Sequence, residues 1–96
     1  MENKFDIRQF VNTMTEQSVV SGIVERMKKK RKRMKLSQKQ LSQKSGVAYS
    51  SIRRFETTGE ISLSSLLKIA HALDSLKDFE GLFTGQAIIS LKDYEG

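Results

Sequence analysis

The sequence predicts an all-α fold, and three observations support this prediction. The 96 residues include no proline and only six glycines, so few positions interrupt a helix. Apolar residues recur three and four positions apart along most of the chain, which is the spacing of one helix face. Aspartate or serine precedes several of these apolar stretches, at the positions where such residues cap helices.

Two helices are predicted in the first third of the chain. Asp6 can cap a short helix over residues 6–15, whose apolar positions are Ile7, Phe10, Val11 and Met14. A polar break from Thr15 to Ser18 separates it from a longer helix over residues 18–34. One stripe of that longer helix is apolar except for a single arginine, and it consists of Val20, Ile23, Val24, Met27, Arg31 and Met34.

Two short helices joined by a tight turn are predicted next. Ser37 and Gln40 have the spacing of a capping box, which predicts the start of a helix of about seven residues. Leu41 faces inward from this helix, and Gly46 can adopt the left-handed conformation that ends it. After the turn, a further helix is predicted over residues 49–57.

The last part of the chain predicts two more helices and an isolated β-prone segment. Ser62 caps a helix with apolar residues at Leu63, Leu66, Leu67, Ala70 and Leu73. A short helix over residues 76–82 presents Leu76, Phe79, Leu82 and Phe83. Residues 86–91 are β-prone, and a lone strand leaves its backbone groups unpaired. This segment therefore pairs with another chain, folds onto the domain edge, or forms a disordered tail.

These elements predict three parts of the chain: an N-terminal helical extension over residues 1–17, a five-helix domain over 18–84, and a tail over 85–96 that is a candidate dimerising strand. The absence of cysteine excludes disulfides and thiolate metal sites, and with no signal segment it predicts a cytoplasmic protein. The apolar runs are far shorter than the roughly 20 residues of a membrane span, so no membrane partner is expected.

An enzyme is not predicted. His71 is the only histidine, and its helical position among apolar residues indicates a surface or partly buried side chain. The sequence contains no glycine-rich phosphate loop, no metal-ligand spacing and no paired nucleophile and base. We expect no catalytic residue, no metal and no cofactor.

Charge is distributed very unevenly along the chain. The segment from Arg26 to Arg54 holds 12 of the 17 basic residues and none of the 11 acidic ones. It therefore carries +12, whereas the rest of the chain sums to −6. Such a segment favours a polyanion, because the polyanion releases counterions when it binds. A solvated helix face, a nuclear-targeting run or an anionic lipid site would give a similar run of lysines.

Residues 36–56 predict two short helices that cross steeply. Ser42 is small enough for the crossing, and Gly46 can adopt the positive φ that the turn requires. Val47, Ile52 and Phe55 provide the buried face of the second helix. This arrangement predicts a helix-turn-helix, the motif that places its second helix in the major groove of DNA.

The exposed face of the second helix follows from 100° per residue. Ser50, Arg54 and Thr57 point away from Ile52, and Tyr49 and Arg53 flank them. Arginine can bond guanine O6 and N7 together, with about 1–3 kcal/mol of discrimination against other bases. This face therefore predicts the side chains that read bases.

From about Ile23 to Phe83 the chain resembles the Cro/repressor-type helix-turn-helix family, also called the XRE family. The residues that carry the resemblance are Leu36-Ser37-Gln38, Leu41, Gly46-Val47, Ser51-Ile52, Phe55-Glu56, Gly59 and the helix from Ser64 to Leu73. The resemblance implies a Cro/repressor-like domain that binds a palindromic double-stranded DNA operator as a homodimer and acts as a repressor. Two stretches, 55–63 and 76–83, are more loosely similar to HipB-type antitoxins, which repress their own operon and bind a toxin.

The resemblance also implies individual site residues. Base-reading positions are Tyr49, Ser50, Arg53 and Arg54, and phosphate-contacting positions are Gln38, Ser37, Lys35, Lys39, Arg33 and Thr58. The family usually has alanine where this chain has Ser42, a change that implies a modest loss of packing. It often has glutamine at the position of Tyr49, so the operator sequence does not transfer.

Two other binding functions stay open. The chain is alternatively a protein-interaction module in which DNA binding is secondary, with residues 1–20 or the tail as contact surfaces. RNA binding is less favoured, because most of the seven aromatic residues fall on apolar stripes and only Tyr49 is free to stack on bases.

Overall fold

The structure, a computed structural model, describes residues 14–85 of the chain. This part forms four α-helices, α2 (Glu16–Arg33), α3 (Gln38–Ser45), α4 (Tyr49–Thr58) and α5 (Leu63–Ala72), and one 3-10 helix, η1 (Leu76–Phe79). Between residues 14 and 85 there is no strand, which confirms an all-helical domain for this part. Residues 6–13 of the first predicted helix and the β-prone segment 86–91 lie outside the described residues.

The long helix α2 begins earlier than its apolar stripe predicts. Thr15 and Ser18 form a reciprocal capping box, in which the Ser18 amide donates to Thr15 Oγ1 and the Thr15 amide donates to Ser18 Oγ, each over 3.1 Å. The polar break predicted from Thr15 to Ser18 is therefore wrong. These residues initiate α2, because their hydroxyls bond the amides that a helix start leaves unpaired.

Two glycines end the helices that surround the motif. Gly46 follows α3 with φ of +81°, and Gly59 follows α4 with φ of +84°. A Cβ at Gly46 would meet no atom within 4 Å, whereas a Cβ at Gly59 would lie 2.5 Å from Val20 Cγ1. Gly59 is thus needed both for its backbone conformation and for the close approach of α2.

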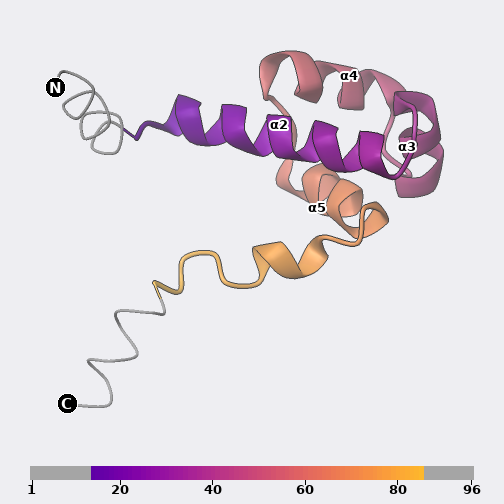
Figure 1. The fold of residues 1–96 in the computed structure, drawn as a ribbon. Helices are drawn as coiled ribbons and strands as arrows, with labels where there is room; N and C mark the ends of the chain where they lie inside the picture. Colours follow the sequence, from indigo (N-terminus) through magenta and orange to yellow (C-terminus); the bar gives the residue numbers. More distant parts are fainter. Residues whose placement is uncertain (1–13, 86–96) are drawn as a thin grey trace, which may run out of the picture.

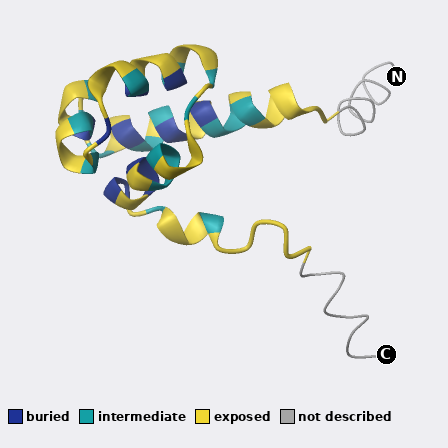
Figure 2. Ribbon diagram, turned by 180° about the vertical axis from the view of Figure 1, so that it is seen from behind, coloured by how far each residue is buried: buried dark blue, intermediate teal, exposed yellow. Residues whose placement is uncertain are grey.

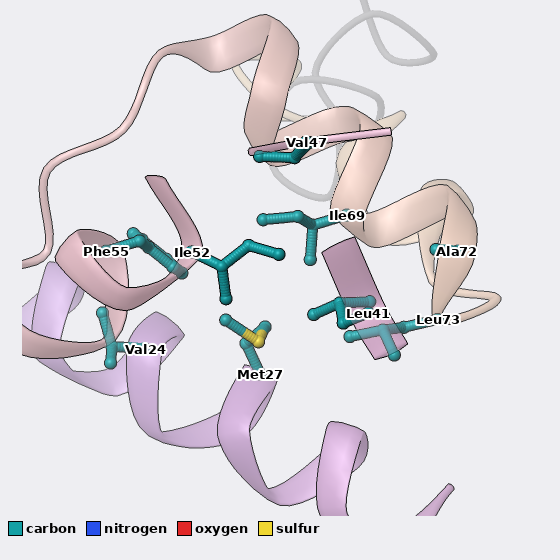
Figure 3. Close-up of a cluster of buried hydrophobic side chains, with 9 residues drawn as sticks. All are labelled: Val24, Met27, Leu41, Val47, Ile52, Phe55, Ile69, Ala72 and Leu73. Atoms are coloured by element: carbon teal, nitrogen blue, oxygen red, sulfur yellow. The ribbon is translucent and has the colours of Figure 1, made fainter. Parts of the chain in front are cut away.

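The core lies between α2, α3, α4 and α5, with α4 along one side of α2 and α5 along the other (Figures 1 and 2). Its buried cluster is shown in Figure 3 and consists of Val24, Met27, Leu41, Val47, Ile52, Phe55, Ile69, Ala72 and Leu73. Ile52 and Leu41 are fully buried. The predicted inward faces of α2, α3 and α4 are confirmed by this cluster.

The two C-terminal elements differ from their predicted packing. Leu63 is exposed, because the buried residues of α5 all lie further along the helix and its first turn projects beyond the core. The helix predicted over residues 76–82 is shorter, a 3-10 turn that ends at Phe79. The chain turns away at Phe83, where φ is +68° and the side chain is fully exposed.

Candidate nucleic-acid interface

Helix α4 is held by one face and open on the other. Ile52 and Phe55 are 0% and 2% exposed, and Val47 just before the helix is also buried. Ser50, Arg53 and Arg54 are exposed on the remaining surface of the same helix. Burial of two large apolar side chains fixes the orientation of α4, because turning the helix would return both to water. The polar face is therefore presented in one orientation.

The turn between α3 and α4 is closed by side-chain hydroxyls. It spans only residues 46–48. Ser42 Oγ donates to the Val47 carbonyl over 2.6 Å, and the Val47 amide donates to Ser45 Oγ over 3.1 Å. Ser42 thus makes a hydrogen bond that alanine could not make. The serine at this position therefore stabilises the turn, in addition to the modest loss of packing expected from the sequence.

Tyr49 gathers two cations at the start of α4. Lys39 Nζ, from α3, lies 5.5 Å from the centre of the tyrosine ring, and Arg53 Cζ lies 5.7 Å from it. Both distances are within the range of a cation–π interaction. Tyr49 is 37% exposed, so the two positive charges beside its ring lie at the surface. The structure brings these three predicted site residues together.

Arg54 is paired with an acid that the sequence interpretation did not single out. Its Nε donates to Glu60 Oε1 over 3.1 Å, and both side chains are about two-thirds exposed. Thr58 supports this pair, since its Oγ1 donates to the Arg54 carbonyl over 2.7 Å and accepts from the Glu60 amide over 3.1 Å. The pair is solvent-exposed, so its contribution to stability is small and it can open.

A buried charge network joins α4 to α2, the helix that packs against it. Arg31 of α2 binds Glu56 of α4 with two bonds, Nε to Oε2 at 2.8 Å and Nη2 to Oε1 at 3.0 Å. Arg31 Nη1 also donates to the Leu36 carbonyl over 2.9 Å, and Gln38 Nε2 donates to Glu56 Oε1 over 2.8 Å. The side chains of Arg31 and Glu56 are 9% and 5% exposed. This network joins α2, α3 and α4.

Sequence reasoning placed Arg31 on an apolar stripe without assigning it a partner. That position was itself the signal, because an arginine among buried residues requires an acid close by. Glu56 fills this role. Gln38, implied as a phosphate contact, uses one amide hydrogen on Glu56, and its second donor stays available.

The other implied phosphate contacts lie in different places. Ser37 caps α3, where its Oγ accepts from the Gln40 amide over 3.0 Å and its own amide donates to Gln40 Oε1 over 2.8 Å. Lys35 is exposed in the link before it, with φ of +60°. Arg33 is exposed as well, but it lines a groove between α2 and α5, on the side of α2 away from α4.

A short helix, a three-residue turn and an amphipathic second helix are the parts of a helix-turn-helix, a DNA-binding motif. The family described as helix-turn-helix matches residues 27–79, which is more than half of the chain. The chain therefore belongs to this family, and it is a regulator of the Cro/repressor, or XRE, type. Comparison with curated proteins and with solved structures finds no match. No helix within residues 14–85 is long and apolar enough to cross a bilayer.

Proposed function

We propose that this regulator reads a specific duplex DNA sequence by placing α4 in the major groove. The observation that carries the proposal is the complete burial of Ile52 beside the exposed Ser50, Arg53 and Arg54. A helix fixed in this way presents its polar side chains at the level of the base edges. The cations near Tyr49 extend the same surface and favour a polyanion.

Four side chains are proposed as base readers, with different chemistry. Arg54 bonds guanine O6 and N7, after its guanidinium leaves Glu60. Ser50 accepts from or donates to a base edge, and Tyr49 contacts the base through its ring or its hydroxyl. Arg53 binds either a base or a phosphate from its place beside the tyrosine ring.

The phosphate contacts surround this reading surface. Lys39 beside Tyr49 and the second amide hydrogen of Gln38 are two of the proposed donors. The amides of the first turn of α3 lack partners within the helix, as at any helix start, and they add to the attraction for phosphate. The remaining proposed contacts are Ser37, Lys35, Arg33 and Thr58.

A homodimer that represses transcription at a palindromic operator is the proposed form of action. The support is the family resemblance together with the one recognition helix found within residues 14–85, since two copies related by a twofold axis read two half-sites. The cytoplasm is the proposed location. The proposed parts of the chain are residues 1–17, 18–84 and 85–96, with the first boundary moved to Thr15, because this residue caps α2.

An autoregulating antitoxin is the narrower proposed role. It is supported by the looser similarity of residues 55–63 and 76–83 to HipB-type regulators. A kinase-like toxin would then be the protein partner, and repression would depend on the ratio of the two proteins. The test is coexpression with the product of the adjacent gene, where a stable complex that changes DNA affinity is the expected result.

The experiment for DNA binding selects bound sites from a random duplex pool and then measures affinity at several salt concentrations. We expect log affinity to fall against log salt with a slope near −5, for about five or six neutralised phosphates. Two half-sites of opposite orientation are expected in the selected pool. An unenriched pool, or binding that ignores salt, would contradict the proposal.

Matched variants separate the two kinds of contact. Arg54→Ala is expected to lose about 1–3 kcal/mol on the selected site and little on unrelated DNA. Lys39→Ala is expected to weaken binding to all sequences and to reduce the salt slope by about one. Lys68→Ala, an exposed lysine on α5, is the control that should leave both unchanged. Equal loss on all sequences for Arg54→Ala would assign it to a phosphate.

A further inference from the structure

A second surface of the domain combines an apolar floor with a basic rim. A groove of about 720 Å³ runs between α2 and the segment from α5 to η1. Apolar side chains from both sides form its floor, among them Val19, Ile23, Leu66, Leu73, Phe79 and Leu82. Val19 and Leu82 are exposed at its edges. Ile23, Leu66 and Phe79 are half-buried and Leu73 is buried, so the part of the apolar surface that meets water lies mainly at Val19 and Leu82.

The rim of the groove is a row of cations on one face of α2. Arg26, Lys29, Lys30 and Arg33 all line it, at the spacing i, i+3, i+4 and i+7 that places side chains on the same side of a helix. None of them forms an ion pair with a residue of the described range. Asp78 is the one acid that lines the groove among residues 14–85. The rim therefore carries an unbalanced positive charge.

This surface lies apart from the DNA-reading face of α4, and of the proposed phosphate contacts only Arg33 also lines the groove. Figures 1 and 2 place α4 and α5 on opposite sides of α2, and the groove lies on the α5 side. Proximity to α4 therefore does not explain the four rim cations. A phosphate backbone alone would gain nothing from the apolar floor, whereas an amphipathic segment would cover the floor and pair with the rim.

We propose that the groove binds an amphipathic α-helix of a partner protein, with an apolar stripe that faces the floor and glutamates or aspartates that face the rim. The stretch of α2 from Val19 to Arg33 is about 20 Å long, which matches a helix of about four turns. Apolar burial supplies the affinity, and the four cations select acidic partners over basic ones.

Charge argues against two other occupants. In a twofold contact through this groove each copy would contribute four cations and one acid, and this net positive charge on both sides disfavours the pairing. The chain's own residues 86–96 contain Asp93 and Glu95 but also Lys92, so they would neutralise little of the rim. A more acidic partner fits the surface better.

The probe is a fluorescein-labelled 18-residue peptide with leucine at i, i+3, i+4 and i+7 and glutamate elsewhere, measured by fluorescence anisotropy with the full chain. We expect a dissociation constant of roughly 1–100 µM, in the usual range for such grooves. One control peptide has the same composition in alternating order, and a second has lysine in place of glutamate. Neither control should bind measurably in this range.

Two charge-reversed variants locate the site. Arg26→Glu with Lys29→Glu, on the rim, is expected to weaken peptide binding by about tenfold or more. The second variant, Lys39→Glu with Lys44→Glu, lies on α3 and has the same net charge as the rim variant. It should change peptide affinity by less than about twofold. Val19→Asp, at the exposed edge of the floor, tests the apolar contact with little risk to the core. It is expected to weaken binding as well, and circular dichroism confirms that each variant is folded.

Several results would overturn the proposal. The first is that the amphipathic peptide and its alternating-order control bind with equal affinity. The second is that the two charge-reversed variants lose the same amount of affinity for the peptide. Tighter binding by full-length Ile88→Asp with Ile89→Asp would show that this chain's own tail fills the groove. Conversion of a dimer to a monomer by the peptide would assign the groove to a second copy, and displacement by selected DNA would merge it with the DNA surface. The direct peptide titration contains no DNA, so its outcome is independent of the proposed DNA binding, and DNA is added only in the separate displacement measurement.

Discussion

Replacement of Arg31 by methionine is expected to destabilise the domain severely. The change keeps most of the aliphatic volume but removes both bonds to Glu56 and the bond to the Leu36 carbonyl. Glu56 would keep only Gln38 as a hydrogen-bond partner within the buried network, with its side chain 5% exposed. Removing one partner of a buried ion pair costs about 3–5 kcal/mol, because the remaining charge is uncompensated.

This loss is comparable to the whole stability of the domain. At about 0.05–0.15 kcal/mol per residue, the described 72 residues correspond to a free energy of unfolding of roughly 4–11 kcal/mol. Urea titration followed by far-ultraviolet circular dichroism measures the change. Arg26→Met, on the exposed part of the same helix, is the matched control and should cost less than about 0.5 kcal/mol.

A double variant tests whether the cost comes from the orphaned acid. Arg31→Met combined with Glu56→Leu removes both charges, so it should recover a substantial part of the lost stability. The reasoning is refuted if Arg31→Met alone costs less than about 1 kcal/mol, or if the two substitutions are simply additive.

Four further substitutions test the turns and the exposed face. Gly46→Ala should lower the free energy of unfolding by about 1–2 kcal/mol, because alanine disfavours the positive φ. Gly59→Ala should lower it clearly more, because the added Cβ would also meet Val20 of α2. Thermal melts rank the two variants. Ser42→Ala should cost about 1–2 kcal/mol by leaving the buried turn carbonyl of Val47 without this donor, and an unchanged urea midpoint would count against it. Tyr49→Leu should change stability by less than about 1 kcal/mol while specific DNA affinity falls by about tenfold, and an equal fall on random DNA would contradict a base-reading role.

The sequence was sufficient to predict the elements that local chemistry determines. Ser37 and Gln40 specify a helix start through their own hydrogen bonds, and the structure confirms that capping box. The inward positions of Ile52 and Phe55 followed from helical spacing and are confirmed by their burial. A cap, a left-handed glycine and an amphipathic stripe need only neighbouring residues, so a single sequence is enough to reveal them.

Features that depend on distant partners were predicted less well. Arg31 and Glu56 lie on separate helices, 25 residues apart, and no short-range pattern identifies them as a pair. Arg54 and Glu60 are only six residues apart, but their pairing depends on the turn that follows α4. The position of the Arg33 side chain likewise depends on how α5 packs beside α2. Near the C-terminal end of the described range, η1 packs on α5. The apolar spacing predicts a helix over residues 76–82, but η1 ends at Phe79.

The hydroxyl bonds that close the turn before α4 have a consequence for the evolution of target choice. With Ser42 and Ser45 fastening the turn and Ile52 anchoring the helix, the outward side chains of α4 contribute nothing to the buried cluster. They can be exchanged as a set, as in grafting one helix surface onto another, without repacking the interior. In the proposed complex with DNA, a few surface substitutions on α4 would therefore change the base sequence that is read while the scaffold stays the same.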